Sequence, residues 1–533
     1  MDQSAEQLDQ DVIVVGSGFG GSVSALRLTE KGYKVLLLEQ GSELRAQDFP
    51  KTNWNIKRWL WAPWIGCRGL FRMMPFRHVV VLAGAGVGGG SLVYANTLPI
   101  PKTAFFKSPS WAHLADWQQE LSAHYQTARR MLGATPSDFL LPADQLLKEV
   151  ADSRGQGSQF EQPHVAVFFG EPDEQVPDPY FAGEGPARRG CKLCGSCMTG
   201  CRHDGKNTLD KNYLYLARKR GLHLLSDCEV VHVTPLDGQR GESGYRVTAL
   251  YGRVPLFRKK LTFTTRQVIF SAGALGTNKL LLRLKDDPSG LPRLSRWLGR
   301  RVRTNSEALI FVTVPGGRDD HSRGIAINSL LQTDENSHLE MVRYGAGSGF
   351  FRLLALPHTG SRLPTWLQLP RILWEVVRHP VRTLRVMSVG DWAKRTMILL
   401  YMRTADGTLA FKRSVLGMKT TLDEGEAPQA QIPEASELAH VIAERSGGVP
   451  MGGVPETLFN IPITAHILGG CPMGEDAEHG VIDARHHLFG YEGLYVIDGA
   501  AISANPGVNP SLTITALAER AMSFIAPKAR PAE

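Results

Sequence analysis

The sequence lacks a hydrophobic run long enough to cross a membrane. Its most apolar window, VVVLAGAGVGGGSLVYA at residues 79–95, is rich in glycine and too short for a convincing span. The first ten residues, MDQSAEQLDQ, lack the basic and apolar parts of a secretory signal. We therefore expect a cytoplasmic protein that contacts a membrane, if at all, only at its surface.

Nucleic-acid-binding motifs are also missing. The formal net charge is +8, but the basic residues are dispersed, and no finger, helix-turn-helix or stacking motif uses them. We predict no nucleic-acid partner. No repeat or low-complexity tract is evident, and 533 residues with 43% hydrophobic side chains are enough for two domains that share an interface.

Glycine is abundant near the N-terminus, in a dinucleotide-binding pattern. Residues 11–15, DVIVV, predict a buried strand, and Gly16, Gly18 and Gly21 in GSGFGG follow it before a helical stretch. A second strand, KVLLLE, ends in Glu39 at the spacing that receives a ribose hydroxyl, while a pyrophosphate lies on the helix N-terminus. This βαβ unit predicts a nucleotide cofactor, but it does not separate FAD from NAD.

Three later segments extend the cofactor pattern. Residues 84–96, GAGVGGGSLVYAN, hold five glycines, which allow backbone amides to approach a planar ring or a phosphate. Residues 268–283 read as a strand, a small-residue turn and a helix, and residues 494–521 as a strand, a loop and a helix that starts near Pro510. A return of the chain to the Rossmann sheet suits a long dinucleotide.

These segments resemble, in their order, the glucose–methanol–choline (GMC) flavin oxidoreductases, and most of all the cholesterol-oxidase-like branch. The resemblance covers nearly the whole chain, through the N-terminal turn and the stretches GVGGGSLVYAN, SAGALGTNKLLL, HILGGCPMG and VIDGAAISANPGVNPSLTITALAER. It implies FAD, an α/β Rossmann-type domain built from residues 1–301 and 461–533, and an α+β substrate domain at 302–460 with a mainly antiparallel sheet. The cofactor positions that we predict are Gly16, Gly18, Gly21, Glu39, Gly86, Gly89, Ser91, Asn96, Ala272, Asp498, Gly499 and Pro510.

The resemblance also implies the catalytic residues. Oxidation of an alcohol by hydride transfer to flavin needs a group that takes the hydroxyl proton and a group that orients the oxygen. His466 in AHILGGCPMG falls where this family has its active-site histidine, and Asn509 in GVNPSL where the cholesterol-oxidase branch has asparagine. Because an amide cannot take a proton at neutral pH, we predict His466 as the base and Asn509 as the orienting donor.

Glu340 in SHLEMVRYG is a third candidate. It aligns loosely with the glutamate that some cholesterol oxidases use to move a proton during double-bond isomerisation. The alternating pattern around it is also that of an ordinary strand. An exposed or ion-paired glutamate is therefore the alternative interpretation.

Two segments combine aromatic and basic side chains. Residues 51–77 contain four tryptophans and six Lys or Arg without an acid, and residues 366–395 contain Trp366, Trp374 and Trp392 with six basic residues. Pro370 predicts the start of a short helix that Pro380 ends. The two segments suggest an entrance for a hydrophobic substrate and a peripheral contact with anionic lipid. The alternative is tryptophans in the core and solvated basic residues.

Four of the seven cysteines lie together in CKLCGSCMTGC. Cys191, Cys194, Cys197 and Cys201 have the C-x2-C-x2-C-x3-C spacing of bacterial ferredoxins, although Arg202 replaces the usual proline. We predict a [4Fe–4S] cluster in an insertion near residues 185–210, ahead of reduced structural thiols and then of zinc or disulfides. Cys67, Cys228 or Cys471 could replace Cys201 as a ligand.

The sequence thus predicts an FAD-dependent dehydrogenase or oxidase for CH–OH groups. Its substrate would be a hydroxyl group on a lipophilic, sterol-like molecule, and its acceptor oxygen, a quinone or a one-electron carrier protein reached through the cluster. One alternative is a flavin-dependent dehydrogenase of sugars or short alcohols. Another is a non-catalytic module that senses redox state through a flavin fold.

Overall fold

The predicted Rossmann-type sheet lies at one end of the protein. The computed structural model describes residues 8–360, 363–415 and 417–529, so most of the N-terminal stretch considered for a signal lies outside the described residues. The sheet has the strand order β10-β2-β1-β13-β12-β11, with β24 also paired to β13. Its strands are β1 (Gln10–Val15), β2 (Val35–Leu38), β10 (His223–Leu225), β11 (Cys228–Pro235), β12 (Tyr245–Tyr251), β13 (Lys259–Phe270) and β24 (Leu494–Val496).

Helices pack beside this sheet, and its central strands are buried. Strands β2, β1, β13 and β24 run parallel, and the crossover between β1 and β2 is helix α1 (Phe19–Glu30). A β-carbon on Gly21 would lie 2.0 Å from the carbonyl oxygen of Gly16, so only glycine lets α1 start this close to the turn. Helix α7 (Gly273–Lys285) contacts β11, helices α13 (Ser511–Ser523) and α6 (Tyr213–Lys219) pack on α1, and α4 (Trp117–Met131) packs on α13.

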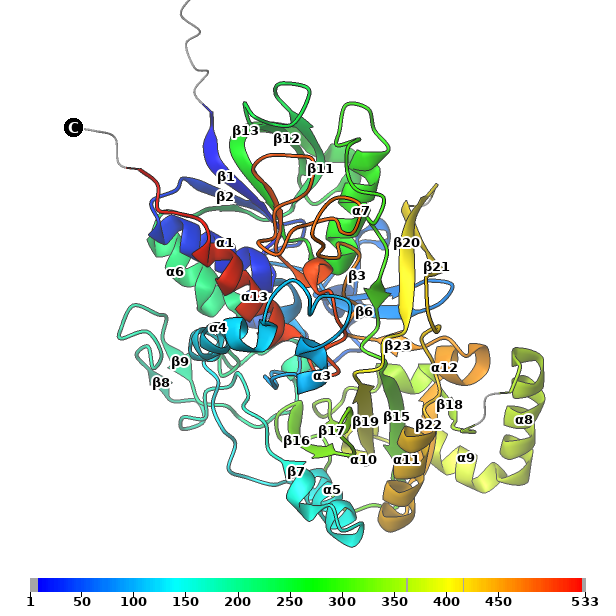
Figure 1. Cartoon of the computed structure of the whole chain (residues 1–533). Coiled ribbons are helices and arrows are strands. Elements are labelled where there is room, and N and C mark those ends of the chain that lie inside the picture. The colour runs from blue at the N-terminus through cyan, green and yellow to red at the C-terminus, as the bar shows by residue number, and fades with distance from the viewer. Residues whose placement is uncertain (1–7, 361–362, 416, 530–533) are drawn as a thin grey trace, which may run out of the picture.

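A second seven-stranded sheet lies at the opposite end (Figure 1). Its order is β18-β22-β15-β19-β17-β16-β7, and the neighbouring strands pair antiparallel. Helices α5 (Pro142–Ser153) and α11 (Pro433–Ser446) share a hydrophobic core with it. The strands are β7 (Phe160–Glu161), β15 (Ala308–Thr313), β16 (Ile327–Gln332), β17 (Ser337–Val342), β18 (Ala355–Pro357), β19 (Thr396–Arg403) and β22 (Val449–Gly453).

The fold class is confirmed: a discontinuous FAD-binding α/β part is joined to a part with an antiparallel sheet. The domain limits remain a prediction, and α5 and β7 pack with the second sheet although they precede residue 302. The remaining strands form small separate sheets: β3 (Trp61–Ala62) with β4 (Cys67–Arg68), β5 (Phe71–Pro75) with β6 (Val80–Gly84) and β23 (Ile463–Thr464), β14 (Val302–Arg303) with β20 (Thr408–Ser414) and β21 (Gly417–Leu422), and β8 (Gln175–Val176) with β9 (Arg188–Arg189).

Two helices project beside the second sheet, α8 (Thr365–Arg378) and α9 (Pro380–Met387) (Figure 1). The predicted start at Pro370 was wrong, because Pro370 lies inside α8, whereas α8 ends at Arg378, just before Pro380, which begins α9. A proline can begin a helix because the first turn has no partner for its missing N–H. Among the described residues, no helix is long and apolar enough to cross a membrane.

Candidate active site

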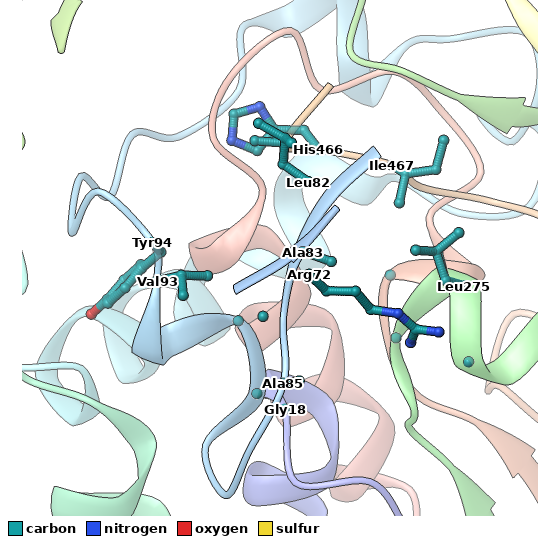
Figure 2. Close-up of a pocket in the computed structure, with 18 of the residues that line it drawn as sticks. Gly18, Arg72, Leu82, Ala83, Ala85, Val93, Tyr94, Leu275, His466 and Ile467 are labelled. Atoms are coloured by element: carbon teal, nitrogen blue, oxygen red, sulfur yellow. The ribbon is translucent and has the colours of Figure 1, made fainter. Parts of the chain in front are cut away.

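A cavity of about 720 Å³ runs from the glycine turn after β1 to the face of the second sheet. Figure 2 shows Gly18 and His466 on opposite sides of this cavity, with Ala83 and Ala85 between them. One end is lined by the backbone of the βαβ unit and by the start of α7, and the other end by side chains of β15, β17 and β19. The cavity therefore joins the two parts of the fold.

Most of the predicted cofactor positions line this cavity. They are Gly16, Gly18, Glu39, Gly89, Ala272, Asp498, Gly499 and Pro510. Gly21, Gly86, Ser91 and Asn96 are not among the lining residues. The Ser91 hydroxyl donates to the Gly88 carbonyl at 2.7 Å and accepts from the Leu209 amide at 3.1 Å, so it holds the glycine loop in place.

Glu39 lies at the end of β2 and faces the glycine turn. Its carboxylate accepts hydrogen bonds from the Ser17 amide at 3.0 Å, the Ser17 hydroxyl at 2.7 Å and the Gly41 amide at 2.8 Å. Burial raises the pKa of Glu39, although these hydrogen bonds oppose the shift. A buried carboxylate at this position is suited to receive a ribose hydroxyl.

The lining fits a long dinucleotide such as FAD. A β-carbon on Gly89 would lie 2.7 Å from the Cα atom of Gly18, so only glycine lets the two loops that line this end of the cavity approach each other so closely. Arg72 on β5 also lines the cavity, and burial lowers its pKa despite the attraction of Glu229. Arg72 is partly exposed, and a guanidinium in the lining of a cavity can pair with an anion.

His466 is held by a carboxylate that the sequence did not reveal. Its Nδ1 lies 2.7 Å from Oε2 of Glu307, which is fully buried, and its backbone amide donates to Thr464 Oγ1 at 2.9 Å. A carboxylate can only accept, so Nδ1 carries the hydrogen and Nε2 keeps a lone pair. Burial opposes the charged form of His466, but the attraction of Glu307 and the hydrogen bond between them outweigh it and raise the pKa of His466.

Asn509 and Glu340 lie together beside this histidine. The Asn509 amide donates to Oε2 of Glu340 at 3.3 Å, and Nε2 of His338 lies 3.4 Å from Oε1 of Glu340. All residues of β17, Glu340 included, are buried, so the exposed form of the alternative interpretation was wrong, whereas the contact with His338 is compatible with its ion-paired form. Asn305 connects the group, because its amide lies 3.4 Å from His466 Nδ1 and donates to the Val508 carbonyl at 3.0 Å.

The far end of the cavity is apolar. Its lining includes, from the second sheet and the segments next to it, Leu309, Phe311, Ile327, Val342, Tyr344, Phe351, Ile398 and Leu400. Apolar walls around a few converging polar groups are typical of a site for a lipophilic ligand.

The tryptophans of residues 51–77 are divided between core and surface. Trp59 and Trp61 are buried, and Trp54 and Trp64 are exposed. Trp64 also lines the cavity, so it lies at the mouth. Phe71 and Met74 of the same segment also line the cavity, which agrees with the prediction of a hydrophobic entrance near this segment.

The geometry does not support the predicted [4Fe–4S] cluster. The described residues contain no group of three or more His, Cys, Asp or Glu side chains placed to hold a metal ion, and all seven cysteines are free thiols. Burial raises the pKa of Cys191 and of Cys197, which opposes the thiolate form that a metal requires. We therefore assign no metal ligand and no electron step to Cys191, Cys194, Cys197 and Cys201.

The cysteine segment instead joins neighbouring parts of the fold. The Gly195 amide donates to the Gly324 carbonyl and the Gly324 amide to the Leu193 carbonyl, both at 2.7 Å. The buried Lys206 ammonium donates to the carbonyls of Tyr94 at 2.9 Å and Cys197 at 2.8 Å, which ties the segment to the glycine loop. These contacts favour the alternative of reduced structural thiols.

Sequence reasoning missed Glu307, Asn305 and Arg72. Glu307 and Asn305 lie in TNSEALIFV, where a carboxylate directly before a buried strand was the available signal. Arg72 lay within a segment interpreted as basic surface. Side chains alternate between the two faces of a strand, so Arg72 on β5 lies on the same face as its partner Ala83 on β6. This alternation was the available signal for the cavity.

Comparisons with known proteins agree with this site. Sequence profiles described as GMC oxidoreductase match residues 186–302 and 422–518, and one described as FAD binding domain matches residues 11–49. A protein of Acinetobacter baumannii named cholesterol oxidase is 44% identical over 98% of this chain and 95% of its own length. Another of that name, from Mycobacterium tuberculosis, is 45% identical over 97% of this chain and 91% of its own length.

The solved structures support the fold. The chain is similar to the crystal structure of pyridoxine 4-oxidase from Mesorbium loti with a TM-score of 0.62, over 97% of this chain and 99% of that one. At 16% sequence identity, this similarity concerns the fold alone.

Proposed function

The chain belongs to the GMC oxidoreductase family and is an FAD-dependent alcohol oxidoreductase, and on that premise we propose that it oxidises the hydroxyl group of a sterol-like, lipophilic alcohol to a carbonyl. The observation that carries the proposal is that His466 and Asn509 line the same cavity as the glycine turn of the βαβ unit and the apolar side chains of the second sheet. Two relatives that match nearly the whole chain are named cholesterol oxidase, and their name supports the same substrate class.

The proposed mechanism assigns one task to each polar group. When bound, FAD supplies an acceptor for the hydride from the carbinol carbon. His466 takes the hydroxyl proton on Nε2, because Glu307 holds the hydrogen on Nδ1 and stabilises the charge that develops on the ring. Asn509 orients the hydroxyl oxygen, and the apolar walls exclude water from the reacting carbon.

We propose that the FAD is held along its whole length by the lining described above. Glu39 would receive the ribose hydroxyl, and the turn at Gly16 and Gly18 the pyrophosphate. Gly89 and the loop from Asp498 to Pro510 would lie nearer the isoalloxazine. The proposed domain division stays at residues 302 and 460, with the cofactor part on either side.

Oxygen is the proposed electron acceptor, because both relatives named here are oxidases. The test of the function is anaerobic addition of a sterol to the FAD-loaded protein, which should bleach the flavin absorbance. Admission of air should then restore the colour and release about one peroxide per ketone formed.

Other outcomes would distinguish the alternatives. Bleaching by sugars or short alcohols, and not by sterols, would overturn the substrate class. A reduced flavin that air does not reoxidise would favour a quinone or a carrier protein. A yellow protein that no alcohol reduces would favour the redox-sensing module.

We propose that Glu340 moves a proton in a following double-bond isomerisation, since it is buried beside Asn509 and near the reacting group. Replacing Glu340 with glutamine keeps the side-chain size but removes the carboxylate. The variant should oxidise a 3-hydroxy-5-ene sterol and accumulate the unconjugated ketone, separable by chromatography. An unchanged product ratio, with oxidation intact, would remove Glu340 from proton transfer.

The Glu307–His466 pair predicts a change in the pH profile. His466 must be neutral to take a proton, so kcat/KM should fall as the pH drops through the pKa of His466. Because Glu307 raises that pKa, Glu307→Gln should move the acidic limb to lower pH. Loss of the orienting carboxylate should also lower the plateau about tenfold. A lowered plateau with an unmoved limb would mean that Glu307 only supports the fold.

A location in the cytoplasm, with contact at the surface of a membrane, remains part of the proposal. A lipophilic alcohol dissolves poorly in water, so an enzyme that collects it at a lipid surface would have the higher local supply. The surface that could make such a contact can be identified from the exposed side chains.

A further inference from the structure

Helices α8 and α9 expose an unusual number of large apolar side chains. Eight of these side chains are between 44% and 74% exposed: Trp366, Leu369, Leu373, Trp374 and Val377 on α8, and Val381, Leu384 and Met387 on α9. Monomeric proteins seldom leave such residues together in water. We call these eight side chains the apolar face and the two helices the α8–α9 hairpin.

The apolar face is a continuous stripe rather than a scatter of residues. On α8, Trp366, Leu369, Leu373 and Val377 are spaced by three and four residues, so they lie one above another on one side of the helix. Another side of α8 holds the buried Ile372, so the helix is attached to the protein and does not need the stripe for its own packing. Within residues 8–360, 363–415 and 417–529, the stripe is left exposed, as a surface for a partner would be.

The charge beside the stripe is almost entirely positive. Arg371 and Arg378 on α8 and Arg382 and Arg385 on α9 are exposed. Opposing them on these helices is one acid, Glu375, which lies 4.0 Å from His379. Apolar residues with two tryptophans and flanking arginines are the composition of a helix that lies in the interface of an anionic bilayer.

The hairpin is connected at both ends to the apolar part of the cavity. Before it, the 3-10 turn Phe350–Leu354 contains Phe351, which lines the cavity, and Arg352, whose guanidinium donates to the Val389 carbonyl just after α9. After it, Trp392 packs edge to face on Phe311, another lining residue, at a centroid distance of 5.6 Å. A partner on the hairpin would thus lie close to the substrate end.

We propose that the apolar face of the α8–α9 hairpin inserts into the surface of an anionic lipid bilayer. The helices contain 14 and 8 residues, too few to cross a bilayer but enough to lie along it. The tryptophans enter the boundary between headgroups and acyl chains, and the arginines meet the lipid phosphates. The docking itself does not depend on the proposed function; only its use, collection of a lipophilic alcohol, rests on it.

The experiment measures flotation of the FAD-loaded full chain with vesicles that contain no sterol. The vesicles are phosphatidylcholine alone, or phosphatidylcholine with about one-third phosphatidylglycerol. The protein should partition to the anionic vesicles, and high salt should weaken the partition. Trp366→Ser with Trp374→Ser should weaken it at least about tenfold. Arg378→Gln with Arg382→Gln should weaken it about fivefold for each charge removed.

Matched controls come from another exposed site. Leu256→Ser with Phe257→Ser removes two side chains that are even more exposed, at 90% and 80%, but lie in a different turn. Lys259→Gln with Lys260→Gln removes two charges on β13. Both control pairs should partition like the natural protein, and flavin absorbance should be retained in every variant, which reports that each is folded.

Three results would overturn the proposal. The first is that the natural protein does not partition to anionic vesicles. The second is that the variant Trp366→Ser with Trp374→Ser partitions as strongly as the natural protein. The third is that the natural protein is a dimer in solution and the variant Trp366→Ser with Trp374→Ser is a monomer. That result would place a second copy of the chain on the apolar face. Since the vesicles contain no substrate, failure of flavin reduction by sterols would leave these results unaffected.

Discussion

Flavin reduction by substrate is expected to slow by about 10²- to 10⁴-fold when His466 is replaced with alanine, the range for loss of a positioned acid–base group. Glu307 holds Nδ1, so Nε2 is the atom that takes the hydroxyl proton, and alanine offers none. The measurement is the rate of anaerobic flavin bleaching in a stopped-flow instrument. FAD should stay bound, since the glycine turns that line the cavity are unchanged in the variant.

A matched control is His479→Ala. This exposed histidine is paired with Asp476 at 2.7 Å, away from the cavity lining. The flavin of this variant should bleach at the rate of the natural protein. If the flavin of His466→Ala were also reduced at the natural rate, another group would have to be the base. The role assigned to Glu307 would then be wrong as well.

Affinity for FAD is expected to fall about hundredfold when Gly89 is replaced with alanine. The residue has a φ of 53°, and a β-carbon would lie 2.7 Å from the Cα atom of Gly18, so the loop must move away from the pyrophosphate turn. Left-handed strain and the clash together cost about 3 kcal/mol, which corresponds to this loss. Titration of the apoprotein with FAD, followed by flavin fluorescence, measures the dissociation constant.

Gly32→Ala separates strain from clash. Gly32 has a φ of 84° with nothing within 4 Å of an added β-carbon, so the variant carries the left-handed strain alone. It should lose some thermal stability and bind FAD normally. Normal FAD binding by Gly89→Ala would show that residues 84–96 do not hold the cofactor in the proposed way.

The part of the site that could be predicted from the sequence is the part made by local chain geometry. The turn at Gly16 and Gly18 and the acid at Glu39 belong to one βαβ unit, so spacing alone placed them on the cavity. Glu307 and His466 are 159 residues apart, and no local pattern shows that a strand in the second sheet will bring them together. Such a pair can be recognised only when the three-dimensional arrangement of the chain is known.

The wrong predictions have a common physical cause. Spacing in CKLCGSCMTGC says how far apart the cysteines are along the chain, but not which way the thiols point or what the backbone bonds to. The Gly195 and Gly324 amides each bond across to the other segment, and burial holds thiols such as Cys197 in the protonated form. Likewise, the composition of residues 51–77 could not show that Trp59 faces the core and Trp64 the solvent.

The pairing of β24 with β13 has a consequence for biosynthesis. The parallel sheet takes its strand β24 from Leu494–Val496, and α13, one of the helices packed on α1, follows it, so the sheet and its helix layer are completed only when more than four hundred residues beyond the N-terminal βαβ unit have been translated. Contacts this remote in sequence form slowly, and an uncovered strand edge invites pairing with other chains. A nascent chain that stalls within the second sheet would therefore be unable to retain flavin and would need a chaperone to stay soluble.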